Sequence, residues 1–163
     1  MNSKELFVRD TTVIKQSDNL YTAEVSENWS IGNTANGGYS MTLAAKAMSE
    51  FLEHKDPLSI SAHYLDRVDF GSTEFHVTHL SSSKSLSTAR VELIQDNKIK
   101  IIFVGTFTDF SFKNDMNIYE RDVPNFPEYN SCEVIPYKEG FNPKLDKNIE
   151  KAYAQDSLWW KKD

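Results

Sequence analysis

The stretch NGGYSMTLAAKAMSEFLEHKDPLSISAHY, residues 36–64, decides the fold. In its first half, apolar residues recur with the spacing of one helix face, at Ala44, Ala47, Met48, Phe51 and Leu52. Only a narrow polar face is left, so we expect a buried helix over residues 38–54. Asn36 is placed to cap its N-terminus. Asp56-Pro57 ends it, because the residue before a proline is disfavoured in the helical region.

After Pro57 the apolar residues alternate with a period of two, which is typical of strands. We expect strands near residues 58–65, 75–78, 87–95 and 99–110, and two shorter ones at residues 11–15 and 21–25. Asp96-Asn97 predicts a hairpin turn. Short connections favour antiparallel pairing. The sequence therefore predicts an α+β fold in which an antiparallel sheet of at least five strands curls around one helix.

Composition limits the classes of function. The 18 Lys and Arg against 24 Asp and Glu give a net charge of −6, and no basic stripe is present, which argues against a general nucleic-acid binder. One cysteine, Cys132, rules out a disulfide framework and a multi-cysteine zinc site. The longest apolar run, residues 101–107, is too short for a membrane span, and the first ten residues lack a signal-peptide core. We expect a cytoplasmic protein.

The segment before the helix carries the candidate chemistry. In residues 29–39, WSIGNTANGGY, a glycine pair opens an apolar helix. Glycines let a ligand approach the backbone, and a helix N-terminus offers free N–H groups and partial positive charge. Such a site can stabilise an oxyanion, for example on a thioester carbonyl. An ordinary tight turn and cap before a buried helix explains the same residues.

The spacing W-x₆-N-G-G-Y before an apolar helix resembles the acyl-CoA thioesterase II-like group of the hotdog superfamily. The blocks at residues 79–87 and 91–96 and the strand after Pro57 strengthen the resemblance, which covers about residues 21–110. It implies the hotdog fold, a long helix wrapped by an antiparallel sheet, and acyl-CoA thioesters as substrates. We expect no cofactor and no metal. Larger members join two hotdog units in one chain.

The resemblance also implies a division of the chain and a set of site residues. Residues 1–112 would form a hotdog domain, residues 113–137 a proline-containing connection, and residues 138–163 the start of a second unit or a C-terminal tail. The glycine backbone would polarise the thioester carbonyl, and Asn36 would orient substrate or water. The expected catalytic residues are Asn36, Gly37 and Gly38, and the expected substrate-binding residues are Trp29, Tyr39 and Tyr64.

The sequence departs from the family pattern at several positions. Ser81, Ser83 and Lys84 stand where an arginine, a glycine and a second arginine are usual, and Asn36 stands where many single-unit thioesterases have histidine. Near the helical position of the usual acidic nucleophile or base, this chain has Lys46. The catalytic Asp, Thr and Gln of two-unit members belong to their second unit. The general base is therefore unassigned and would come from a partner chain or further sequence.

Other polar residues are weaker candidates. The four histidines lack metal-ligand spacing and are expected at the surface: His54, His63, His76 and His79. Ser85 and Ser87 have no histidine close in sequence. Asp66, Asp69 and Glu74 are expected to form a solvated acidic loop.

Three functions are compatible with these residues. The first is an enzyme that hydrolyses acyl-CoA thioesters. The second is a non-catalytic acyl-binding or scaffolding hotdog unit that completes a sheet with a partner. The third, a hotdog hydratase or dehydratase, requires an Asp/His pair that the sequence does not place. An isolated sheet of this kind leaves an open edge, so we expect a homo-oligomer joined through sheet edges.

Overall fold

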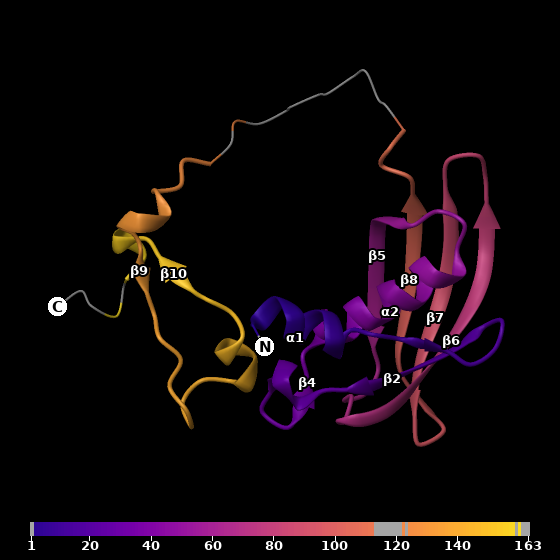
Figure 1. The fold of residues 1–163 in the computed structure, drawn as a ribbon, viewed down its shortest axis with the longest axis horizontal. Helices are drawn as coiled ribbons and strands as arrows, with labels where there is room; N and C mark the ends of the chain where they lie inside the picture. The colour runs from indigo at the N-terminus through magenta and orange to yellow at the C-terminus, as the bar shows by residue number, and fades with distance from the viewer. Residues whose placement is uncertain (1, 113–121, 123, 159, 161–163) are drawn as a thin grey trace.

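A computed structural model describes residues 2–112, 122, 124–158 and 160. One six-stranded antiparallel sheet, in the order β1-β2-β6-β7-β8-β5, wraps around helix α2, Gly37–Phe51 (Figure 1). This arrangement confirms the predicted α+β class. The strands are β1 Ile14–Lys15, β2 Leu20–Val25, β5 Asp56–Tyr64, β6 Gly71–Ser82, β7 Ser87–Gln95 and β8 Lys98–Thr108.

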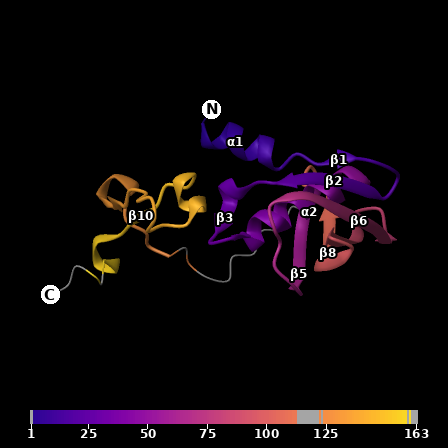
Figure 2. The same cartoon turned by 90° about the horizontal axis from the view of Figure 1, so that it is seen from below.

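Helix α2 lies in the hollow of the sheet, as a second view shows (Figure 2). Its apolar stripe meets the inward-facing side chains of the sheet, and the residues of this core are fully buried, including Leu43, Met48, Phe75, Val91 and Phe103. The packing is tight around Gly105, where an added Cβ would lie 2.5 Å from the Met48 sulfur. The helix therefore leaves no room for a ligand at this part of its contact with the sheet.

The helix boundaries differ slightly from the prediction. The helix begins at Gly37 and ends at Phe51, three residues before His54, because Leu52 is already extended with ψ of 157°. Asp56-Pro57 begins β5 rather than ending the helix. The predicted turn at Asp96 and Asn97 is confirmed, with positive φ at both residues, as a two-residue hairpin loop requires.

A short helix that we did not predict, α1 Ser3–Asp10, precedes the sheet. Asn2 and Glu5 form a reciprocal capping box at its start, which is a local signal in the sequence. Thr11 and Thr12 follow the helix and bond back to it, so the strand predicted from Thr11 is reduced to β1. The helix packs Phe7 edge-to-face against Trp29, with ring centroids 4.9 Å apart.

Between β2 and α2 lie the 3-10 turn η1 Glu27–Trp29 and a small hairpin of β3 Ser30–Ile31 and β4 Thr34–Ala35. The C-terminal part of the chain has short elements: η2 Tyr129–Ser131, β9 Glu133–Val134, η3 Lys144–Lys147, β10 Ala152–Tyr153 and η4 Gln155–Ser157. β9 pairs with β10. None of the described helices is long and apolar enough to cross a membrane.

Candidate functional site at the N-terminus of helix α2

Asn36 caps helix α2, as predicted. Its side-chain oxygen accepts hydrogen bonds from the backbone N–H of Gly38, at 2.9 Å, and of Tyr39, at 3.1 Å. Two of the N–H groups that a helix start leaves unpaired are thus satisfied by one side chain. The cap therefore occupies the Gly38 N–H, which the sequence had offered as a donor to substrate.

Gly37 is the first residue of the helix, and within the described residues its N–H has no acceptor. Tyr64, at the end of β5, lies directly against it. A Cβ added to Gly37 would stand 2.9 Å from both Cε1 and the hydroxyl oxygen of Tyr64. The structure therefore brings together two of the predicted site residues, from the helix start and from the edge strand.

A cleft of about 370 Å³ opens beside Gly37. The loop after β5 forms one wall and the β4–α2 turn the other; the lining residues are Thr34, Ala35, Gly37, Ser40, Tyr64, Leu65, Asp66, Arg67, Val68 and Ile101. Backbone bonds fix this loop at both ends. The N–H groups of Leu65 and Asp66 donate to the Lys100 carbonyl, and the Val68 carbonyl accepts from Ala35 N–H. The walls are therefore preorganised by the sheet.

Asp66 is a carboxylate on the wall of this cleft. Lys100 Nζ lies 3.0 Å from its Oδ2, and the Arg67 N–H donates to its Oδ1 at 2.8 Å. The hydrogen bond with the Lys100 ammonium lowers the pKa of Asp66 and raises the pKa of Lys100. A carboxylate with a lowered pKa stays ionised but is a poor general base. The expectation of a solvated loop thus missed the ion pair that holds Asp66.

Trp29 and Tyr39 lie in the core rather than on the cleft wall. Both are buried, and their rings stack with centroids 6.1 Å apart. The Tyr39 hydroxyl donates to the Asp10 carbonyl at 2.6 Å, and burial raises the pKa of this phenol. The Trp29 ring N–H donates to the Asp10 carboxylate at 3.1 Å. The two aromatic residues therefore tie α1 to the start of α2.

A second, smaller cleft of about 200 Å³ lies further along α2, between the helix and β5. Thr42, Ala45, Lys46, Ser49, Lys55, Pro57 and Phe107 line it. The charged groups on its walls are lysines, and no carboxylate is among its lining residues. Near the helical position where related thioesterases are expected to have an acidic residue, this chain therefore has the exposed Lys46.

His54 is buried, not at the surface as predicted. Its Nδ1 lies 3.0 Å from Ser87 Oγ and its Nε2 lies 3.3 Å from the Lys84 carbonyl. A carbonyl only accepts, so Nε2 donates to it, and Nδ1 and the serine hydroxyl form the second hydrogen bond. Sequence reasoning missed this pair because 33 positions separate its members. Ser87 is fully buried, so the pair joins β7 to the end of α2 and offers no accessible nucleophile.

Two of the three remaining histidines bond locally: His76 pairs with Glu74, and His79 bonds to Ser82, both on β6. His63 is exposed on β5, as predicted. Among the described residues, no three His, Cys, Asp or Glu side chains come together as a metal site would require.

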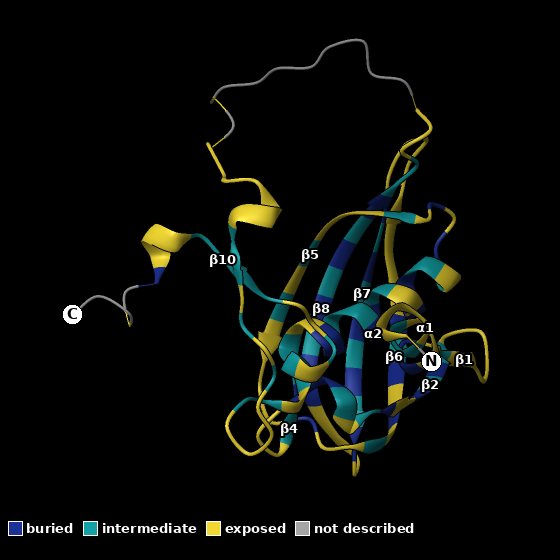
Figure 3. Ribbon diagram, turned by 60° about the vertical axis from the view of Figure 1, so that its left-hand side comes forward, coloured by how far each residue is buried: buried dark blue, intermediate teal, exposed yellow. Residues whose placement is uncertain are grey.

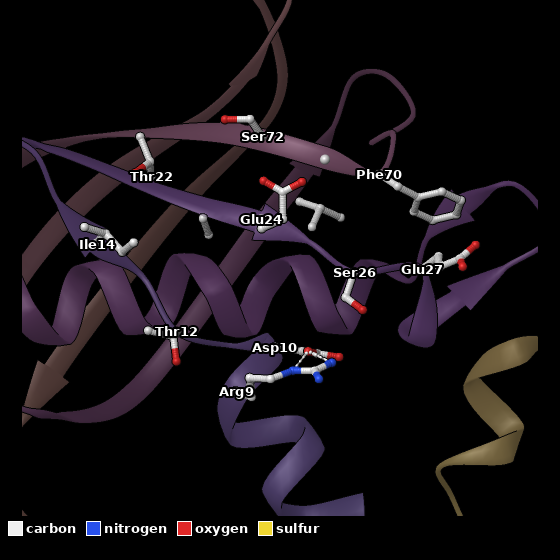
Figure 4. Close-up of a pocket in the computed structure, with 13 residues that line it drawn as sticks. Arg9, Asp10, Thr12, Ile14, Thr22, Glu24, Ser26, Glu27, Phe70 and Ser72 are labelled. Carbon is white, nitrogen blue, oxygen red and sulfur yellow. Dashed lines mark hydrogen bonds and ion pairs between the residues drawn. The ribbon is translucent and has the colours of Figure 1, made fainter. Parts of the chain in front are cut away.

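A groove of about 820 Å³ lies between α1 and β2 (Figure 4). Arg9, paired with Asp10, and the carboxylates of Glu24 and Glu27 stand around it. None of the predicted site residues lines this groove.

A family model described as the acyl-CoA thioesterase N-terminal domain matches residues 25–109, which include α2, the cleft walls and the strands β5, β6, β7 and β8. The chain belongs to this family. The matched range contains the helix start, Tyr64 and the loop after β5, so the candidate site lies within this acyl-CoA thioesterase domain.

Solved structures agree on the fold of the thioesterase domain. A protein described as a thioesterase II from Thermobifida fusca is 20% identical, with a TM-score of 0.81 over 96% of this chain and 58% of that one. A hot dog fold protein from Alicyclobacillus acidocaldarius is 11% identical, with a TM-score of 0.74 over 86% of this chain and 52% of that one. The acyl-CoA thioesterase II TesB2 from Mycobacterium marinum is 15% identical, with a TM-score of 0.63 over 80% and 52%.

These likenesses confirm the hotdog fold of the domain. The chain spans little more than half the length of the three structures. No protein of curated function matches the sequence significantly.

Proposed function

We propose that this domain binds acyl-CoA thioesters in the cleft beside Gly37 and takes part in their hydrolysis in the cytoplasm. The observation that carries the proposal is Gly37 at the start of α2: it lies against Tyr64, lines a cleft with fixed walls, and has no acceptor for its N–H among the described residues. A free N–H at a helix N-terminus, together with the helix dipole, favours the negative charge that develops on a thioester carbonyl oxygen. Membership in the family supports the substrate class.

In the proposed reaction, water adds to the thioester carbonyl carbon. The tetrahedral intermediate then collapses, the carbon–sulfur bond breaks, and free CoA thiol and a carboxylic acid are released. Gly37 N–H would donate to the carbonyl oxygen. Asn36 would act through the backbone, by holding the first turn of α2 in place.

The water needs a general base, and the two clefts do not supply a good one. The pKa of Asp66 is lowered by Lys100, and the second cleft carries Lys46. We propose that the base comes from a second hotdog unit or a partner chain. In this division of the chain, residues 1–112 form one hotdog unit, residues 113–137 a connection, and residues 138–163 the start of another unit or a tail.

The lack of a good base specifically favours a second candidate function. In that alternative, the domain binds the acyl-CoA thioester without cleaving it, and completes a sheet with its partner. The two functions share the cleft and differ in whether free CoA appears.

The test follows free CoA with a thiol reagent, using short-chain and long-chain acyl-CoAs, and measures binding of the same compounds by calorimetry. The proposal expects binding and thiol release that both decline when Gly37 is replaced by valine. Binding without thiol release would leave the second function. A protein that neither binds nor hydrolyses any acyl-CoA would overturn both.

A further inference from the structure

Residues 143–148 of the C-terminal part return to the hotdog unit and dock on the segment that precedes helix α2. The turn η3 lies against η1 and β3. Both ribbon views place its yellow coil beside the purple segment between α1 and β4 (Figures 1 and 2). In the burial view, this part of the chain carries intermediate residues among exposed ones (Figure 3).

Three side chains make this contact. Leu145 is partly buried and packs against the hydrophobic core. Asn148 Nδ2 donates to the Asn28 carbonyl at 3.0 Å. Lys144 Nζ lies 2.5 Å from Glu27 Oε2, but both side chains are more than half exposed, at 55% and 60%. Because exposed ion pairs contribute little, Leu145 and Asn148 carry the contact.

Asn28 is held from two sides. Its carbonyl accepts from Asn148, and its side-chain amide donates to the buried Asp10 carboxylate at 2.9 Å. The same carboxylate accepts from the Trp29 ring N–H. Asp10 and Asn148, from opposite ends of the described chain, therefore both hold the single turn η1 in place.

The turn η1 leads directly to the cap of α2. The Trp29 carbonyl accepts from the Asn36 N–H at 2.9 Å, and Ser30 pairs with Ala35 across the small hairpin between them. The backbone position of Asn36 is thus fixed by η1. A shift of η1 would move the oxygen that holds the N–H groups of Gly38 and Tyr39.

We infer that Asn148 and Leu145 are positioning residues for the start of α2, and that they act through Asn28, Trp29 and Asn36. The expected effect on hydrolysis rests on the proposed function, whereas the expected effect on the start of α2 does not. Neither residue lines the cleft, so each acts at a distance from bound substrate. The docked segment makes the geometry of the site depend on chain that follows the hotdog unit.

The structural step is tested by amide hydrogen exchange in the full chain. Asn148→Ala, which removes one hydrogen bond, and Leu145→Ala, which removes a packing contact, should each speed exchange at Gly38 and Tyr39, by roughly three- to tenfold. Asn142→Ala is the matched control: it lies just before the docked residues, and its side-chain oxygen accepts a hydrogen bond from the nearby Lys138 N–H. It should leave both amides unchanged.

Kinetics supply a readout that a general loss of stability would not give. Where wild-type protein hydrolyses acyl-CoA, Asn148→Ala should lower kcat with little change in KM, because an oxyanion donor acts mainly in the transition state. The control should retain both constants.

The outcomes separate the inference from the proposed function. Faster exchange of residues 144–148 in the variants, with Gly38 and Tyr39 unchanged, would overturn the inference. Faster exchange at Gly38 and Tyr39 in a protein that binds no acyl-CoA would support the inference and overturn the proposed function. If Leu145→Ala does not fold, Asn148→Ala decides the result, because it removes one partly exposed side chain.

Discussion

Tyr64 covers Gly37 so closely that a single added carbon on the glycine would lie 2.9 Å from the phenol ring. Tyr64 ends the edge strand β5 and is about half exposed, at 53%, whereas Gly37 opens the central helix. The ring is the far end of a rotatable side chain and can move aside. The glycine therefore matters for where the ring rests rather than for whether the domain folds.

Gly37→Ala tests this relationship. Alanine is compatible with the first turn of a helix, so the free energy of unfolding should change by less than about 1 kcal/mol. The added Cβ displaces Tyr64 and narrows the approach to the Gly37 N–H, so binding and hydrolysis of acyl-CoA should fall by about tenfold or more. Chemical denaturation and the thiol-release assay measure the two effects.

Tyr64→Ala completes a double-mutant cycle with Gly37→Ala. If the alanine at residue 37 acts by displacing the ring, then Gly37→Ala should cost less activity in the Tyr64→Ala background. Strictly additive losses would contradict this contact as the cause.

Asn36→Asp keeps the cap of helix α2 and adds a negative charge at the site. Aspartate caps helices as well as asparagine and favours the helix dipole, so stability should be kept or slightly raised at neutral pH. The new negative charge lies beside the proposed oxyanion position, so thioester hydrolysis should fall by about tenfold or more. Asn36→Ala is the comparison, since it should lose about 1 kcal/mol of stability while adding no charge. Equal activity in Asn36→Asp and wild type would show that the thioester carbonyl does not bind beside the start of α2.

The sequence was sufficient to predict α2, its cap and the four strands that follow it, because these features depend on local periodicity and turn residues. Asn36 and the Asp96-Asn97 turn are local signals of this kind. The cleft walls were not predictable in this way, because they depend on the Lys100 carbonyl and side chain meeting a loop 34 positions earlier.

The site residues show the same limit. Both Gly37 and Gly38 precede an apolar helix in sequence, and only the structure shows that the cap occupies one N–H and leaves the other. Trp29 and Tyr39 carry the family spacing, yet Asp10 in the unpredicted helix α1 draws both into the core. His54 and Ser87 met for an equally long-range reason, the return of β7 beside the end of α2.

The edge strand β5 provides a prediction about assembly. β5 pairs only with β8, and its outer side is open in the described part of the chain. Leu58 and Tyr64 on β5 are exposed, and so is Leu65, which directly follows the strand. Figure 3 shows exposed stretches of β5 in yellow. Open apolar edges favour pairing with another strand, so we expect a homodimer in light scattering at micromolar concentration. Leu58→Lys should shift the protein toward monomer.

Leu80→Lys is the matched control for assembly. Leu80 is similarly exposed, at 50% against 56% for Leu58, but it lies on β6, which β7 and β8 separate from β5 in the sheet. The control should leave the dimer unchanged. A wild-type monomer, or equal effects of the two lysines, would contradict association through β5.

Asp10 makes the stability of the domain sensitive to acid. Burial alone would raise the pKa of this carboxyl, but hydrogen bonds from Asn28, Arg9, Ser26 and Trp29 outweigh it and lower the pKa below its ordinary value. A carboxyl with a lower pKa in the folded state adds stability at any pH above the unfolded value, near 4. That contribution is lost as the pH falls below about 4, through the folded pKa.

Asp10→Asn should therefore lose about 1–2 kcal/mol at pH 7, since bonds to a charged acceptor are replaced by weaker ones. The difference between wild type and variant should shrink between about pH 4 and pH 2 in urea unfolding experiments. Asp18→Asn, in the exposed loop between β1 and β2, serves as the control and should be near neutral at pH 7. A difference between wild type and Asp10→Asn that stays constant down to pH 2 would show that the carboxylate charge contributes nothing to holding η1.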